Sequence, residues 1–132
     1  MSKIVFYKLI FFGSVFVLVI LSLYPGNLIG LIFFGDDSTV PGSDKMHHFL
    51  SYLLTSTFGF LAYSDKNFFR LFLFFLSLGF FLEVSHLWIP NRYFEFLDLI
   101  ANFSGVLLSF FLFVILKKNF FKNNFLKITN KF

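Results

Sequence analysis

Charged and hydrogen-bonding side chains that could bind an anion, a metal ion or a proton are concentrated in a few short segments of an otherwise apolar chain. A charged group at the centre of a bilayer costs roughly 2.5–3.5 kcal/mol on insertion scales. Several such groups bordering or entering apolar segments therefore indicate a polar site. The candidate site residues are Asp44, Lys45, His48, Glu83, His86, Arg92, Asp98 and Asn102.

The types and spacing of these residues favour particular chemistry. Asp44 and His48 are four residues apart, so they share one face of a helix. The planar guanidinium of Arg92 suits a phosphate or carboxylate group. His48 and Glu83 are the candidates for a general acid or base. We expect Lys45 and Arg92 to hold an anion while the other residues shape and orient the site.

Structural roles would also account for the charged residues. Glu83 lies well inside its predicted helix and could be the buried partner of Arg92 or Lys45. Arg92 could instead contact phospholipid headgroups or form an ion pair with Glu95 or Asp98. A ligand site and a set of structural ion pairs are both compatible with these residues.

Helix ends and helix packing offer a second structural explanation. An acidic residue at a helix start, such as Asp44, caps the helix and interacts favourably with its dipole. Asp98, Asn102, Gly105 and Ser109 are spaced four, three and four residues apart, so they form one stripe. Small residues let membrane helices approach closely, and asparagine can bond across them. This stripe is therefore also compatible with a packing seam.

No known catalytic or metal-binding motif is complete in this sequence. Cysteine is absent, which excludes disulfides, cysteine-ligated zinc and thiol catalysis. Glu83-x-x-His86 is half of the di-iron bundle motif and occurs once. A single metal ion held by His48, Glu83, His86 and Asp98 is a chemically reasonable alternative. There is no glycine-rich phosphate loop, serine elbow or His-Glu-x-x-His motif, so neither a metal nor a cofactor is assigned.

Four apolar helices are predicted to position the site. Hydrophobic residues form 58% of the 132-residue chain and charged residues 14%, against about 25% charged residues in average soluble domains. A soluble chain of this size could not cover so much apolar surface, so a lipid bilayer is its expected surrounding. We expect an all-α, four-transmembrane-helix bundle in a single membrane domain, residues 1–132. The predicted helices are about residues 4–24, 43–63, 68–89 and 97–116.

The other segments contain turn or basic residues. Residues 27–43 are expected to form a loop, in which the apolar run 28–34 is too short to span a membrane. Residues 64–67 are a polar turn, and Pro90 ends the third helix. Residues 117–132 interleave lysine with phenylalanine and are expected to be a basic interfacial tail on an anionic leaflet.

The distribution of lysine and arginine predicts the orientation. If the N-terminus is cytoplasmic, nine of the eleven basic residues lie on the inner side and two on the outer side. This is the bias expected of cytoplasmic segments. Both termini are therefore predicted to be cytoplasmic, and the candidate site to lie at the outer surface. The nine are Lys3, Lys8, Lys66, Arg70, Lys117, Lys118, Lys122, Lys127 and Lys131; the two are Lys45 and Arg92.

Three blocks of residues follow a recognisable pattern. They are Asp44-Lys45-x-x-His48-Phe49-x-x-Tyr52, Glu83-x-x-His86-x-Trp88-x-Pro90-x-Arg92 and Asp98-x-x-x-Asn102-x-x-Gly105. Together they resemble the VanZ-like family of small bacterial integral membrane proteins, over about residues 40–110. The family pattern has a glutamine where this chain has His86, a phenylalanine where it has Trp88, and a glycine where it has Ser109. Because of the first difference, the role of the family's glutamine cannot be carried over.

The resemblance implies a multi-pass protein of the bacterial cytoplasmic (inner) membrane and the cell envelope. The family's founding member is associated with low-level teicoplanin resistance, which implies a link to glycopeptide tolerance. Three functions stay open: binding of an anionic headgroup or lipid-linked envelope precursor, a small intramembrane enzyme acting on such a molecule, and a helix-packing module without a ligand. The lipid bilayer is the expected partner, and nucleic acid is not.

Overall fold

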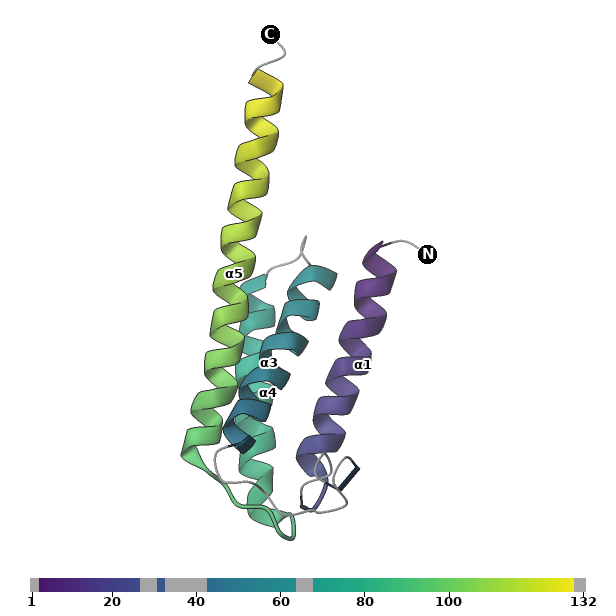
Figure 1. Cartoon of the computed structure of the whole chain (residues 1–132), viewed down its shortest axis with the longest axis vertical. Helices are drawn as coiled ribbons and strands as arrows, with labels where there is room; N and C mark the ends of the chain where they lie inside the picture. Colours follow the sequence, from purple (N-terminus) through teal and green to yellow (C-terminus); the bar gives the residue numbers. More distant parts are fainter. Residues whose placement is uncertain (1–2, 27–30, 33–42, 64–67, 130–132) are drawn as a thin grey trace.

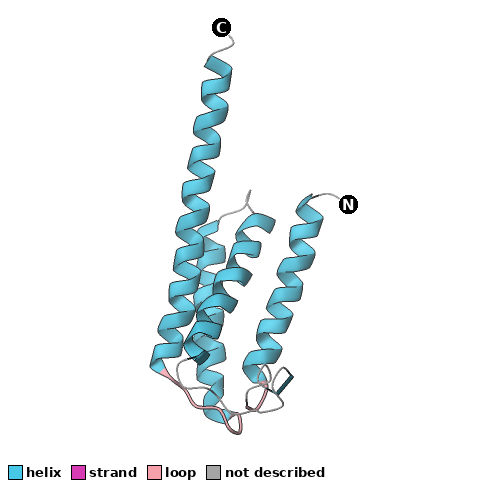
Figure 2. Ribbon diagram, in the orientation of Figure 1, coloured by secondary structure: helices cyan, strands magenta, loops and turns pink. Residues whose placement is uncertain are grey.

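The described part of the chain is built from helices. The computed structural model describes residues 3–26, 31–32, 43–63 and 68–129. The long helices are α1 (Lys3–Leu23), α3 (Ser43–Ala62), α4 (Phe68–Ser85) and α5 (Phe96–Thr129), and α4 is followed by a 3-10 turn, η1 (His86–Trp88). Figure 2 shows this all-helical architecture.

Three of the helices are long and apolar enough to cross a membrane. The candidate spans are Ile4–Leu23, Phe68–Trp88 and Phe96–Lys118. About 20 apolar residues, at a rise of about 1.5 Å each, match a hydrocarbon core of about 30 Å. In length and composition, this is a multi-pass membrane protein.

Helix α3 is less apolar than α1, α4 and α5. It lies at the centre of the bundle. It packs most extensively against α5, next against α1, and also against α4. Consecutive helices run in opposite directions, and the start of α1 and the end of α5 point to the same side (Figure 1). Its neighbours shield much of α3, so it can carry polar residues that a lipid-facing helix could not.

Aromatic side chains fill the centre of the bundle. Phe60 and Phe75 are fully buried, and their ring centroids lie 6.0 Å apart. Phe60 also stacks on Phe113, at 5.6 Å. Other large apolar side chains face outward, among them Phe16 and Phe81, each 67% exposed. Such an apolar exterior is expected where lipid is the solvent.

The predicted stripe on α5 faces α3. Asp98, Asn102 and Ser109 are each at most 2% exposed. The hydroxyl groups of Ser109 and Thr57 are hydrogen-bonded at 2.9 Å. At Gly105 the two backbones approach so closely that a Cβ atom would collide with the carbonyl oxygen of Phe49. The α3–α5 seam therefore depends on small and polar residues, as is common between membrane helices.

The helix ends differ from the predicted ones in two places. Helix α4 ends at Ser85, and the chain tightens into a 3-10 turn before Pro90. The prediction that the last helix ends near residue 116 is wrong, because α5 continues to Thr129. Residues 117–129 contain no glycine or proline to stop it.

The remaining segment predictions are not tested. Helix α5 has 34 residues, which at about 1.5 Å each span about 51 Å. It extends past its neighbours (Figure 1). The interfacial position of the tail stays a prediction. The turn at 64–67 and most of the loop at 27–43, including five residues of 28–34, lie outside the described ranges.

Candidate functional site

The eight predicted site residues all lie at one end of the bundle. At this end α1 and α4 finish while α3 and α5 begin, as Figure 1 shows at the lower side of the view. The antiparallel order of the helices brings these four helix ends together. The residues form two adjoining groups, one between α3 and α5 and the other between α4 and α1.

Lys45 links the start of α3 to the start of α5. Its ammonium group donates a hydrogen bond to Glu95 Oε2 at 2.8 Å and lies 3.2 Å from Asp98 Oδ1. The ammonium group of Lys45 is therefore shared between two carboxylates.

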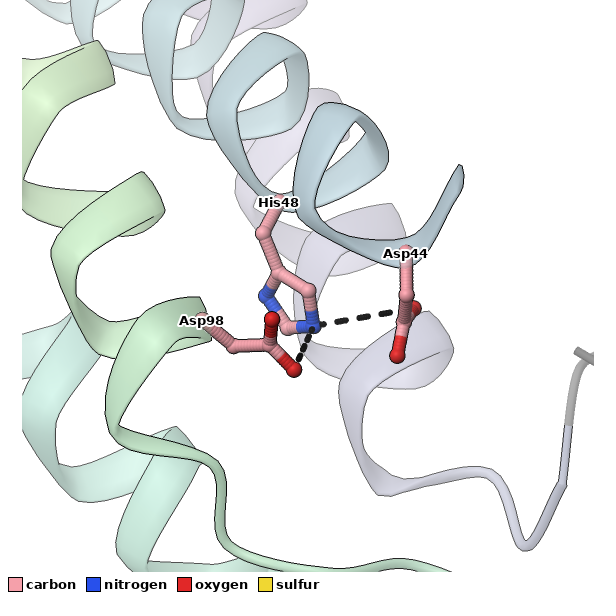
Figure 3. Close-up of side chains that lie close together, drawn as sticks. All are labelled: Asp44, His48 and Asp98. Carbon is pink, nitrogen blue, oxygen red and sulfur yellow. Dashed lines mark ion pairs between the residues drawn. The ribbon is translucent and has the colours of Figure 1, made fainter. Parts of the chain in front are cut away.

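His48 is held by hydrogen bonding on one side and faces carboxylates on the other. Its Nδ1 atom lies 3.0 Å from Asn102 Oδ1. Its Nε2 atom lies 3.8 Å from Asp98 Oδ2 and 3.9 Å from Asp44 Oδ1. Figure 3 shows the imidazole between the two carboxylates, one from its own helix and one from α5. The contact between His48 and Asn102 joins residues 54 positions apart in the sequence.

Glu83 and His86 form the second group, and both are almost completely buried. Glu83 Oε1 lies 3.3 Å from His86 Nδ1 and accepts a hydrogen bond from the backbone N–H of Glu95 at 3.0 Å. His86 Nε2 lies 3.1 Å from the backbone oxygen of Ser22 in α1. The rings of His86 and His48 have centroids 6.3 Å apart, so the two groups adjoin.

Arg92 binds the C-terminal end of α1. Its Nε donates to the carbonyl oxygen of Tyr24 at 3.1 Å, and its Nη2 donates to that of Leu21 at 2.9 Å. The last carbonyls of a helix lack partners within the helix, and a cation there is favoured by the helix dipole. Ion pairs of Arg92 with Glu83, Glu95 or Asp98, the structural alternatives from the sequence, are not found among the described residues.

A cavity of about 60 Å³ opens beside these groups. Tyr52 is 3% exposed, and its hydroxyl group has no hydrogen-bond partner within the described ranges. Most buried polar atoms are hydrogen-bonded, so this hydroxyl is an exception in a residue that lines the cavity. The lining residues are Leu18, Leu21, Ser22, Asp44, His47, His48, Ser51, Tyr52, Arg92 and Asn102.

Two carboxylate oxygens are also buried without a hydrogen bond from the described residues, Glu83 Oε2 and Asp98 Oδ1. Asp98 Oδ1 still has the Lys45 ammonium within 3.2 Å, so its environment is not free of positive charge. The contribution of α1, through the backbone of Leu21, Ser22 and Tyr24, was not predicted. The one sequence signal was Ser22, a hydroxyl near the end of an apolar run.

Comparisons with protein-family models, curated proteins and solved structures found no match to this chain.

Proposed function

We propose that this protein is a VanZ-like envelope protein of the bacterial cytoplasmic membrane, in which α3 is a fourth span and both termini are cytoplasmic. Its polar end would bind the anionic headgroup of a lipid or of a lipid-linked envelope precursor on the outer side. The resemblance of residues 40–110 extends the proposal to glycopeptide tolerance of the teicoplanin type.

The direction of the helices supports a fourth span. Helix α3 starts at the end of the bundle where α1 finishes and returns to the end where α4 begins (Figure 1). If α1, α4 and α5 cross the bilayer, α3 must carry the chain back across it. Its 20 residues are long enough for this, at about 30 Å.

The observation that carries the ligand proposal is the hydroxyl of Tyr52, which has no hydrogen-bond partner among the described residues. Tyr52 lines the same cavity as Ser22, Ser51 and Arg92. A guanidinium has five N–H donors, and the structure shows two N–H groups of Arg92 bound to carbonyls of α1. The remaining donors and these hydroxyl groups suit a phosphate oxygen, which only accepts hydrogen bonds.

Lipid binding by the purified protein tests the proposal. In detergent containing a chelator, we expect phosphatidylglycerol to bind more tightly than phosphatidylcholine, measured by native mass spectrometry. Tyr52→Phe should weaken phosphatidylglycerol binding about tenfold, because it removes one hydrogen bond to a charged group. Tyr63→Phe is the matched control, since this half-buried tyrosine lies at the other end of α3. Equal binding of both lipids, or wild-type binding by Tyr52→Phe, would contradict the proposal.

A membrane enzyme is the second candidate function, and the position of His48 favours it. Histidine is the side chain that most often acts as a general acid or base, and it must be held in position to do so. An enzyme should lose turnover but remain folded in His48→Gln. A helix-packing module should instead lose its folded state when these polar contacts are removed.

A further inference from the structure

Asp44, His48 and Asp98 form a compact cluster between α3 and α5. One potential ligand atom from each of the three residues lies within 4.8 Å of the other two. In Figure 3 the side chains of the three residues point toward a common space. Asp98 is 2% exposed; its Oδ1 atom lies 3.2 Å from the Lys45 ammonium, and its Oδ2 atom lies 3.8 Å from His48 Nε2. The cluster therefore contains a buried carboxylate with one oxygen directed to the imidazole.

The hydrogen bond to Asn102 determines which nitrogen of His48 is available. Asn102 Oδ1 is an acceptor, so His48 Nδ1 must carry the hydrogen that joins them. Nε2 is then the nitrogen that faces the two carboxylates, at 3.8 and 3.9 Å. A metal ion placed between these three atoms would be bound by a nitrogen and two oxygens.

The local charge also calls for a cation. Asp44, Asp98 and Glu95 bring three negative charges, and Lys45 brings one positive charge. Three carboxylates therefore lie around one ammonium group. Lys45 lies closer to Glu95, at 2.8 Å, than to Asp98, at 3.2 Å, so it can remain on Glu95. The positive charge of Arg92 is directed to carbonyls of α1.

We propose that Asp44, His48 and Asp98 bind one first-row divalent cation of the zinc or manganese class. One imidazole nitrogen and carboxylate oxygens are suitable ligands for these ions. Ligand atoms around tetrahedral zinc, with bonds of about 2.0–2.2 Å, lie about 3.4 Å apart. The distances of 3.8 and 3.9 Å therefore need only small side-chain rotations. Asn102 would be the outer partner that orients the histidine.

The site would keep a coordination position open toward the cavity. Three protein ligands with one open position are typical of zinc sites that bind a substrate or activate water. Asp44 and His48 line the cavity that Tyr52 also lines. An ion there could take an oxygen of a phosphate group as its fourth ligand. Metal binding itself needs no lipid, so this inference stands or fails independently of the proposed headgroup binding.

Metal titration of the purified full chain in detergent tests the site. The protein should carry no polyhistidine tag and be freed of metal with a chelator. Zn²⁺ binding is then followed by competition with a metal-sensitive dye, and Mn²⁺ binding by electron paramagnetic resonance. We expect one equivalent of Zn²⁺ to bind, more tightly than Mn²⁺. Asp44→Asn, His48→Gln and Asp98→Asn should each weaken Zn²⁺ binding at least 30-fold, and Asn102→Ala about tenfold.

His47→Gln is the matched control, because it removes a neighbouring imidazole that is not part of the cluster. It should bind Zn²⁺ within about threefold of the wild type. Circular dichroism and size-exclusion chromatography establish that each variant is folded, and Asp44→Asn provides the test if the more buried Asp98→Asn does not fold. The inference is overturned if the folded wild type binds no Zn²⁺, if His48→Gln binds it normally, or if His47→Gln loses as much affinity as His48→Gln.

Discussion

Single buried charges impose the strictest requirements on this molecule. Glu83 is 1% exposed, and its bound oxygen has two partners, His86 and the backbone N–H of Glu95. His86 in turn reaches the backbone of Ser22. A buried charge that loses its partner costs far more than an exposed one. The pair of Glu83 and His86 therefore matters for stability whatever the site binds.

Replacement of His86 tests this dependence. His86→Leu should lower the free energy of unfolding by about 3–5 kcal/mol, because it leaves a buried carboxylate without its side-chain partner. His86→Gln should cost only about 1 kcal/mol, since an amide N–H can still donate to Glu83. Unfolding in mixed micelles by a denaturing detergent measures both.

His47→Leu is the control for this experiment. His47 is half-buried on α3 and forms no side-chain hydrogen bond in the described part of the chain. Its replacement should change stability by less than about 0.5 kcal/mol. Equal stability losses in His86→Leu and His86→Gln would show that the shape of the imidazole, rather than its bond to Glu83, is what matters.

At the scale of elements, the close approach of α3 and α5 fixes the geometry of the site. Lys45 and His48 reach Asp98 and Asn102 across this seam. A Cβ atom on Gly105 would also lie 3.0 Å from the backbone nitrogen of Leu53, and backbone atoms cannot move aside as a flexible side chain can. The distance between the two helices is therefore set seven residues along α5 from the charged cluster.

Gly105→Ala should destabilise the protein by about 1–3 kcal/mol, the usual range for overpacking. Because it pushes the helices apart, it should also weaken any Zn²⁺ binding at Asp98. Gly13→Ala on α1 is the matched control, since a Cβ there would meet no atom within 4 Å in the described structure. That variant should be neutral or slightly stabilising. Denaturing-detergent titration of both variants makes the comparison, and equal stability would mean that the seam can widen freely.

At the scale of the whole molecule, the two ends of the bundle differ in character. One end gathers buried acids and histidines, and the other receives the start of α1 and the long extension of α5 (Figure 1). Lysines flank the bundle at that second end, for example Lys8 over the ring of Tyr63 and Lys117 over that of Phe68. This asymmetry agrees with a cytoplasmic position for the basic end.

Cysteine labelling tests the orientation without background, because the chain has no native cysteine. In intact cells, Tyr93→Cys should react with a membrane-impermeant maleimide, and Lys118→Cys should react only after permeabilisation. Tyr93 is 79% exposed at the acidic end. Asn91 is a poorer choice, because its φ of 59° would strain a cysteine. The reverse labelling pattern would place the candidate site in the cytoplasm and contradict the proposed function.

How far sequence could predict this structure depends on the kind of interaction. Apolar runs and helix periodicity predicted the helices and the stripe of Asp98, Asn102 and Gly105, because both follow from spacing along one helix. The contacts of Arg92 could not be predicted in this way, since every helix offers the same unpaired carbonyls at its end. The length of α5 was missed because a fall in hydropathy does not stop a helix when glycine and proline are absent.

The capping of α1 by Arg92 also constrains when the molecule can become complete during synthesis. The carbonyls of Tyr24 and Leu21 lie 68 and 71 positions before the guanidinium that binds them. At roughly 5–20 residues per second, a ribosome needs about 3–14 s to make the intervening chain. Throughout that interval α1 is already long enough to enter the membrane while its end still lacks this partner. Helix α1 is therefore the first helix to be made, but its end receives the contact with Arg92 only after α4 has been made.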